Sequence, residues 1–138
     1  ADSVLVQRVV ARNGTIIMGG NTENDVDRLT VKSSIYTGAA LIQLGNGNDI
    51  ANILNSQARG SLRAEGAGGN DTVTISNGTV GDFTLYCGAG DDTAVYGGRF
   101  KITGEIYADG GPGIDTDTRK PGTMLEYSDP NPVLINFE

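Results

Sequence analysis

Residues 66–74 read GAGGNDTVT, a glycine-rich turn followed by an aspartate and a short run of β-forming residues. The same pattern recurs as LGNGNDIAN at 44–52, CGAGDDTAV at 87–95 and GGPGIDTDT at 110–118. The aspartates of the four copies stand at positions 49, 71, 92 and 115, so they are 22, 21 and 23 residues apart. A period of this length predicts a solenoid in which each repeat forms one coil.

Apolar residues alternate with polar ones on both sides of each aspartate. Val73 and Ile75 follow Asp71 at two and four positions, and Leu62 and Ala64 precede it at nine and seven. At minus nine and minus seven the other copies hold Ala40, Ile42, Phe83, Leu85, Ile106 and Ala108. Period-two alternation predicts strands with one buried face. Each coil therefore has two clear strands around the turn, and a third segment leads into the next coil.

Equivalent strands at this spacing predict an all-β fold, a short parallel β-helix of about five coils. We expect it to be right-handed, as parallel crossovers are. Residues 1–138 form one domain, with coils over 14–118, the first of them a degenerate coil around Asp27. We expect an N-terminal cap at 1–13 and a C-terminal cap at 119–138, where three of the four prolines lie. The alternative is an antiparallel sandwich with hairpins at the glycine turns.

Composition narrows the classes of function. The net charge of −7 argues against nucleic-acid binding, which requires clustered Lys and Arg. No apolar run approaches the roughly 20 residues of a membrane span, so membrane insertion is not expected. The single cysteine, Cys87, has no internal partner for a disulfide, and we expect a buried, unreactive thiol.

The turn residues have a structural explanation. Gly47, Gly69, Gly90 and Gly113 each lie two positions before a repeat aspartate. A tight turn needs positive φ or a close approach of backbone, and glycine permits both. The aspartate carboxylate can accept hydrogen bonds from nearby backbone N–H groups and so fix the turn.

The same turns resemble the calcium-binding repeat of RTX (haemolysin-type) proteins, G-G-x-G-x-D-x-U-x, with U a large apolar residue. Residues 110–115, GGPGID, match its first six positions, and the other turns each lose one glycine. The resemblance implies Ca²⁺ held by carboxylates and turn carbonyls. The ligands would be Asp49, Asp71, Asp92 and Asp115, with Asp91 beside them. RTX motifs recur every nine residues, whereas this chain has one motif per coil.

More generally, the chain resembles the Gly-Asp-rich β-helix repeats of secreted bacterial surface proteins. That resemblance implies a secreted or cell-surface location and a non-enzymatic, structural or adhesive module, with calcium stabilisation at the turns. Its implied partners are further copies of the chain, through the end coils, or a surface polysaccharide.

A carbohydrate-active β-helix, either lyase-like or hydrolase-like, is the alternative. Such a protein needs several carboxylates and a basic residue along a groove on one outward face. The sequence offers Arg63 before Glu65, and Arg99 and Lys101 on the coil next to Asp82. The chain has no histidine, so many general-base schemes are absent. We therefore expect no catalytic residues.

Overall fold

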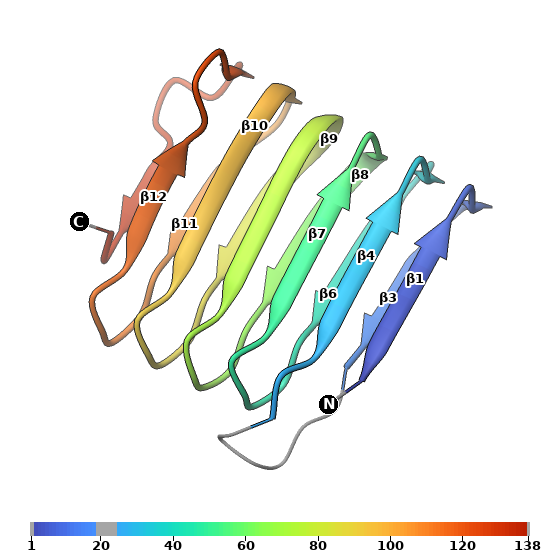
Figure 1. Cartoon of the computed structure of the whole chain (residues 1–138). Helices are drawn as coiled ribbons and strands as arrows, with labels where there is room; N and C mark the ends of the chain where they lie inside the picture. The colour runs from blue at the N-terminus through green and yellow to red at the C-terminus, as the bar shows by residue number, and fades with distance from the viewer. Residues whose placement is uncertain (1, 19–24, 138) are drawn as a thin grey trace.

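The computed structural model describes residues 2–18 and 25–137 and shows a parallel β-solenoid of about six turns (Figure 1). The coils repeat at about 22 residues, and the described residues contain no helix. Paired strands of successive coils run parallel, for example β4 with β7 and β7 with β9. The predicted β-helix is thus confirmed, and the antiparallel sandwich is excluded.

Each coil has three faces, and equivalent faces stack along the solenoid. The first face comprises β1 (Ser3–Gln7), β4 (Arg28–Lys32), β7 (Ile50–Leu54), the starts of β9 (Thr72–Tyr86) and β10 (Thr93–Ile102), and β12 (Thr116–Arg119). The second comprises β2 (Val10–Ala11), β5 (Ile35–Tyr36), the start of β8 (Gln57–Glu65), later parts of β9 and β10, and β13 (Met124–Tyr127). The third comprises β3 (Gly14–Ile17), β6 (Ala39–Gln43), the ends of β8 and β9, β11 (Ile106–Asp109) and β14 (Val133–Ile135).

The coil count is about six rather than the expected five, because coils also form where we expected caps. β1 pairs with β4 in register, with Ser3 opposite Arg28. At the other end, β12 and β13 pair with β10, and β14 pairs with β11. As far as they are described, 1–13 and 119–138 therefore belong to the first and last coils (Figure 1). The turn expected at 21–25 lies largely outside the described residues.

The core consists of the inward columns that the alternation predicts. The minus-nine residues Leu62, Phe83 and Ile106 stack on one another and are buried. The plus-two and plus-four residues of the central coils, such as Val73 and Ile75, are buried as well. Three aromatic side chains thicken the core near its C-terminal end, where Phe83 meets Phe100 edge-to-face at 5.7 Å and also contacts Tyr96.

The glycine before each repeat aspartate packs directly against the preceding coil. Gly69 has a φ of +105°, which disfavours any residue with a Cβ. A Cβ there would also overlap the carbonyl oxygen of Gly47, one coil earlier. Gly90 stands in the same relation to Gly69, and Gly113 to Gly90. Positive φ and close approach of the backbone, the two reasons for glycine that the sequence suggests, therefore both apply at Gly69.

Gly69→Ala should lower the free energy of unfolding by more than about 2 kcal/mol, since the new methyl group forces two coils apart. Gly122→Ala is the matched control. Gly122 also has positive φ, +77°, but a Cβ there meets nothing within 4 Å. Its cost should be limited to about 1 kcal/mol of backbone strain. Urea unfolding of both variants measures the difference, and equal losses would contradict the packing argument.

Candidate functional site

The repeat aspartates form one buried column at the turn between the third and first faces. Their residues are between 0 and 2% exposed. The members of this column are Asp27, Asp49, Asp71, Asp92 and Asp115. We call them the Asp ladder. Their side chains lie on the inward side of the chain, as do the apolar residues two and four positions later.

Hydrogen bonds along the ladder run in one direction. The N–H of each aspartate donates to Oδ1 of the aspartate in the following coil. The distances are 2.8 Å from Asp27 to Asp49, 2.8 Å from Asp49 to Asp71, 2.7 Å from Asp71 to Asp92 and 2.8 Å from Asp92 to Asp115. The Asp2 N–H donates to Oδ1 of Asp27 at 2.6 Å, which places Asp2 at the same position of the first coil. Each coil junction thus has a polar link made by a side chain, and the four links from Asp27 to Asp115 are buried.

The second carboxylate oxygen of the ladder has a different environment. Oδ2 of each of the five buried aspartates is inaccessible and has no hydrogen-bond partner. Burial disfavours the charged form, and it raises the pKa of Asp71 to about 7 and that of Asp92 to about 6. Burial also raises the pKa of Asp49. Neighbouring ladder carboxylates raise these pKa values further, so burial and charge repulsion favour the neutral acid at these three aspartates.

A second ladder runs beside the first on the outer side of the turn. The Asn70 N–H donates to Oδ1 of Asn48 at 2.7 Å, and the Asp91 N–H donates to Oδ1 of Asn70 at 2.9 Å. The Ile114 N–H then donates to Oδ1 of Asp91 at 2.9 Å. These bonds point from a later coil to an earlier one, opposite to the Asp ladder. They are exposed to solvent, so water can replace them.

The turn carbonyls are also engaged between coils. The N–H groups of Gly47 and Gly69 donate at 2.8 Å to the oxygens of Gly68 and Ala89, each in the following coil. The Gly90 N–H donates to the oxygen of Pro112 at 3.0 Å. The turns are therefore tied to each other by backbone as well as by side chains.

This donor set does not fit the calcium site that the RTX resemblance implies. Calcium takes six to eight oxygen ligands that converge on one point. Here Oδ1 of each ladder aspartate accepts a backbone N–H, the carboxylates lie inside the solenoid, and Asp91 belongs to the separate outer ladder. Among the described residues, no three Asp, Glu, Cys or His side chains form a group that could hold a metal ion.

Cys87 lies next to the ladder and is buried, as predicted. Burial, followed by the carboxylates of Asp92, Asp115 and Asp71, raises the pKa of its thiol to about 12. A thiol that stays protonated is a poor nucleophile. The expectation of an inert packing residue is consistent with this environment.

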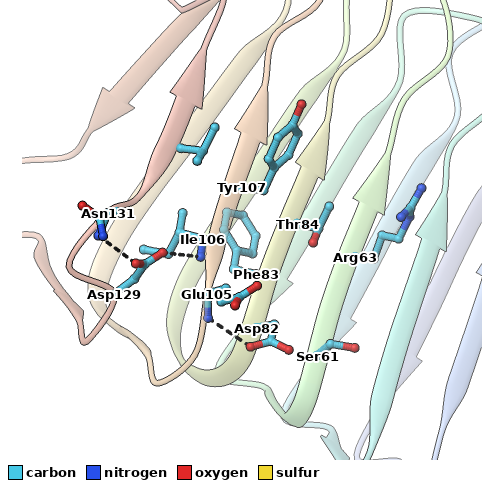
Figure 2. Close-up of a pocket in the computed structure, with 11 residues that line it drawn as sticks. Ser61, Arg63, Asp82, Phe83, Thr84, Glu105, Ile106, Tyr107, Asp129 and Asn131 are labelled. Atoms are coloured by element: carbon cyan, nitrogen blue, oxygen red, sulfur yellow. Dashed lines mark hydrogen bonds between the residues drawn. The ribbon is translucent and has the colours of Figure 1, made fainter.

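A hollow of about 580 Å³ lies on the outward side of the third face, across β8, β9, β11 and the segment before β14 (Figure 2). Three acidic residues line it, Asp82, Glu105 and Asp129. Oδ1 of Asp82 accepts the Glu105 N–H at 3.0 Å, and Oδ2 of Asp129 accepts the Ile106 N–H at 3.0 Å. These bonds fix two of the three carboxylates, on the coils before and after the coil of Glu105 (Figure 2).

Aromatic and basic groups complete the hollow. The Tyr107 ring lies 5.2 Å from that of Tyr86, and the Arg63 guanidinium lies 4.9 Å from the Tyr86 ring centre. Arg63 also pairs with Glu65, whose pKa is held below its usual value by the Gln43 amide and then by Arg63. Arg63 is the one cation among the described residues that line the hollow, and it is already paired. The three lining carboxylates therefore leave the hollow acidic.

The sequence reasoning missed two kinds of functional residue. Asp2 escaped notice because it lies 25 residues before Asp27 rather than 22, although Val4 and Val6 follow it at the usual offsets. Asp129 and Asn131 of the hollow come from a segment without any repeat, so no periodic signal points to them. The predicted site residues Asp49, Asp71, Asp92 and Asp115 are brought together, but as a column inside the fold.

Comparison of the chain with models of known protein families, with curated protein sequences and with solved structures finds no match. Within the described residues, the chain contains no helix with the length and apolarity that a bilayer crossing demands.

Asp49→Ala should show that a bond of the Asp ladder contributes more to stability than a bond of the outer ladder. It leaves the buried Asp27 N–H without an acceptor, which costs about 1–3 kcal/mol. Asn48→Ala, one residue away, removes an exposed acceptor that water replaces, and should cost less than about 1 kcal/mol. Amide hydrogen exchange of Asp27 is the direct readout, with faster exchange expected in Asp49→Ala alone. Unchanged protection there would contradict the assigned bond.

Proposed function

We propose that this chain is a non-enzymatic structural module, a rigid β-solenoid for a secreted or cell-surface setting. The observation that carries the proposal is the Asp ladder, which together with the Asp2 N–H links successive coils from Asp2 to Asp115. Side-chain bonds of this kind specify the register between coils. The interior beside them is filled by packed side chains.

In this proposal, hydrogen bonds rather than bound ions stabilise the turns. Oδ1 of each ladder residue already accepts an N–H, and the turn carbonyls accept others. The glycine column brings successive turns into direct contact, as between Gly69 and Gly47. An ion inserted between coils would have to break these contacts.

The melting temperature in millimolar Ca²⁺ should therefore equal that in excess chelator. An ion bound only by the folded chain must raise it, by an amount that grows with ion concentration. Mg²⁺ at the same concentration controls for ionic strength. A calcium-specific rise that Asp92→Asn abolishes would replace our proposal with the calcium-stabilised module.

Carbohydrate binding is a second candidate function, and the hollow of Figure 2 favours it. The hollow combines three carboxylates and an arginine on one outward face, as a carbohydrate-active β-helix requires. Carboxylates accept hydrogen bonds from sugar hydroxyls, and the apolar face of a sugar ring packs on an aromatic ring such as Tyr107. The acidic balance favours a neutral oligosaccharide over a uronate. We propose binding without cleavage.

Tyr107→Ala should abolish binding of neutral oligosaccharides, because it removes the aromatic surface of the hollow. Tyr127→Ala is the control, since Tyr127 is 48% exposed on the second face. Chemical-shift perturbation of backbone amides during titration with a panel of such oligosaccharides measures the effect. Shifts that do not map to the third face, or equal loss in both variants, would exclude this site.

A further inference from the structure

The Asp ladder presents a physical problem that its hydrogen bonds do not solve. Five carboxyl groups lie in one buried column, and each has an Oδ2 atom without a partner. A buried ionised carboxylate is costly unless its charge is paired and its oxygens accept hydrogen bonds. A proton on Oδ2 removes the charge and converts an unpaired acceptor into a donor.

The structure provides an acceptor for such a proton at Asp71. Oδ2 of Asp71 and the carbonyl oxygen of Cys87 both lie against the position that a Cβ on Gly66 would occupy. The two oxygens therefore lie close together beside the Gly66 Cα. Neither can donate when the carboxylate is ionised, and the negative charges on the two oxygens then repel each other. When Asp71 is the neutral acid, its O–H can bond to the carbonyl.

The groups that face Asp71 reinforce the neutral form. Asp49 lies one coil before it and Asp92 one coil after it, and both are acids. The thiol of Cys87 is the third titratable neighbour, and it is itself uncharged. Cations do not figure among the groups that perturb Asp71. Burial raises its pKa most, and the carboxylates of Asp92 and Asp49 raise it further. The backbone N–H groups of Asp49 and Ala67 act the other way without reversing the shift.

We propose that the Asp ladder is a proton-binding device at the position where the turns resemble calcium sites. Asp71 is held as the neutral acid, with its Oδ2–H donating to the main-chain oxygen of Cys87. Release of this proton leaves two acceptor oxygens close together inside the fold without a hydrogen between them. It thereby loosens the two junctions that join the third, fourth and fifth coils. The solenoid is thus tightest in acid and weakens towards mildly alkaline pH.

The sign follows from linkage. The folded-state pKa of Asp71 lies above its ordinary value, so folding takes up a proton between the two values. The stabilisation is fully present below about pH 4 and is lost as the pH rises through about 7. This trend is opposite to that of a salt-bridged carboxylate, which loses stabilisation in acid.

The test is the melting temperature of the whole chain at about pH 4.5 and about pH 8, in high salt that screens surface repulsion. The wild-type melting temperature should fall by about 5 °C or more over this range. Asp71→Asn keeps an acceptor for the Asp49 N–H, and its side-chain amide can donate a hydrogen bond at every pH. The melting temperature of this variant should therefore fall clearly less than that of the wild type. Asp82→Asn makes the same charge change at an exposed site and should fall as the wild type does.

A second measurement on the unmodified chain covers the case that Asp71→Asn fails to fold. The ¹³C shift of the Asp71 carboxyl carbon should titrate near pH 7, well above the ordinary pKa of an aspartate. Titration of Asp71 near pH 4, or parallel melting profiles for the two asparagine variants, would overturn the proposal. So would a restoration of wild-type melting at about pH 8 by millimolar Ca²⁺, because a cation would then occupy the place we assign to a proton.

Discussion

The bond from each aspartate N–H to Oδ1 of the next aspartate is the interaction on which the stacking depends. At the turn this N–H lies outside the strands, and a buried N–H without an acceptor costs about 1–3 kcal/mol. The side chain of the following coil supplies the acceptor. The aspartate carbonyl is engaged as well, because the Asp49 oxygen accepts the Thr72 N–H at 2.8 Å. Two bonds therefore join each pair of coils at one residue, and a slip in register breaks both.

The glycine column and the two ladders act on the same turn. Glycine lets the backbone of one coil rest on the backbone of the coil before it, so the turns stack as closely as the strands do. The Asp ladder then holds the inner side of the turn and the Asn48, Asn70 and Asp91 ladder holds the outer side, with bonds in opposite directions. The turn is therefore held on both its inner and its outer side. The glycine and the aspartate are needed for this stacking, which explains why the motif varies least at these two positions.

Much of the fold could be read from sequence because its rules are periodic. The offsets of Leu62, Val73 and Ile75 from Asp71 identify strands and core, and the structure buries all three. The inward direction of Asp71 also followed from the sequence. Alternate residues of a strand point to the same side, and Asp71 lies two and four positions before the buried Val73 and Ile75. The resemblance to RTX turns implied instead a carboxylate that binds Ca²⁺. The hollow could not be read, because Asp129 comes from an aperiodic segment and meets Asp82 and Glu105 only through the winding of the last coil.

The contrast between the two ladders supports a proton at the inner one. The exposed positions accept both asparagine and aspartate, as at Asn48, Asn70 and Asp91, because water completes whatever the protein leaves unpaired. The inner position is aspartate in all six coils, and it is buried in the five coils from Asp27 to Asp115. A buried asparagine brings two N–H donors, and Cys87 O offers one acceptor beside Asp71. A neutral aspartic acid brings one donor and keeps Oδ1 for the ladder. Asparagine and aspartic acid have the same size. Only the protonated acid has as many donors as there are acceptors beside Asp71.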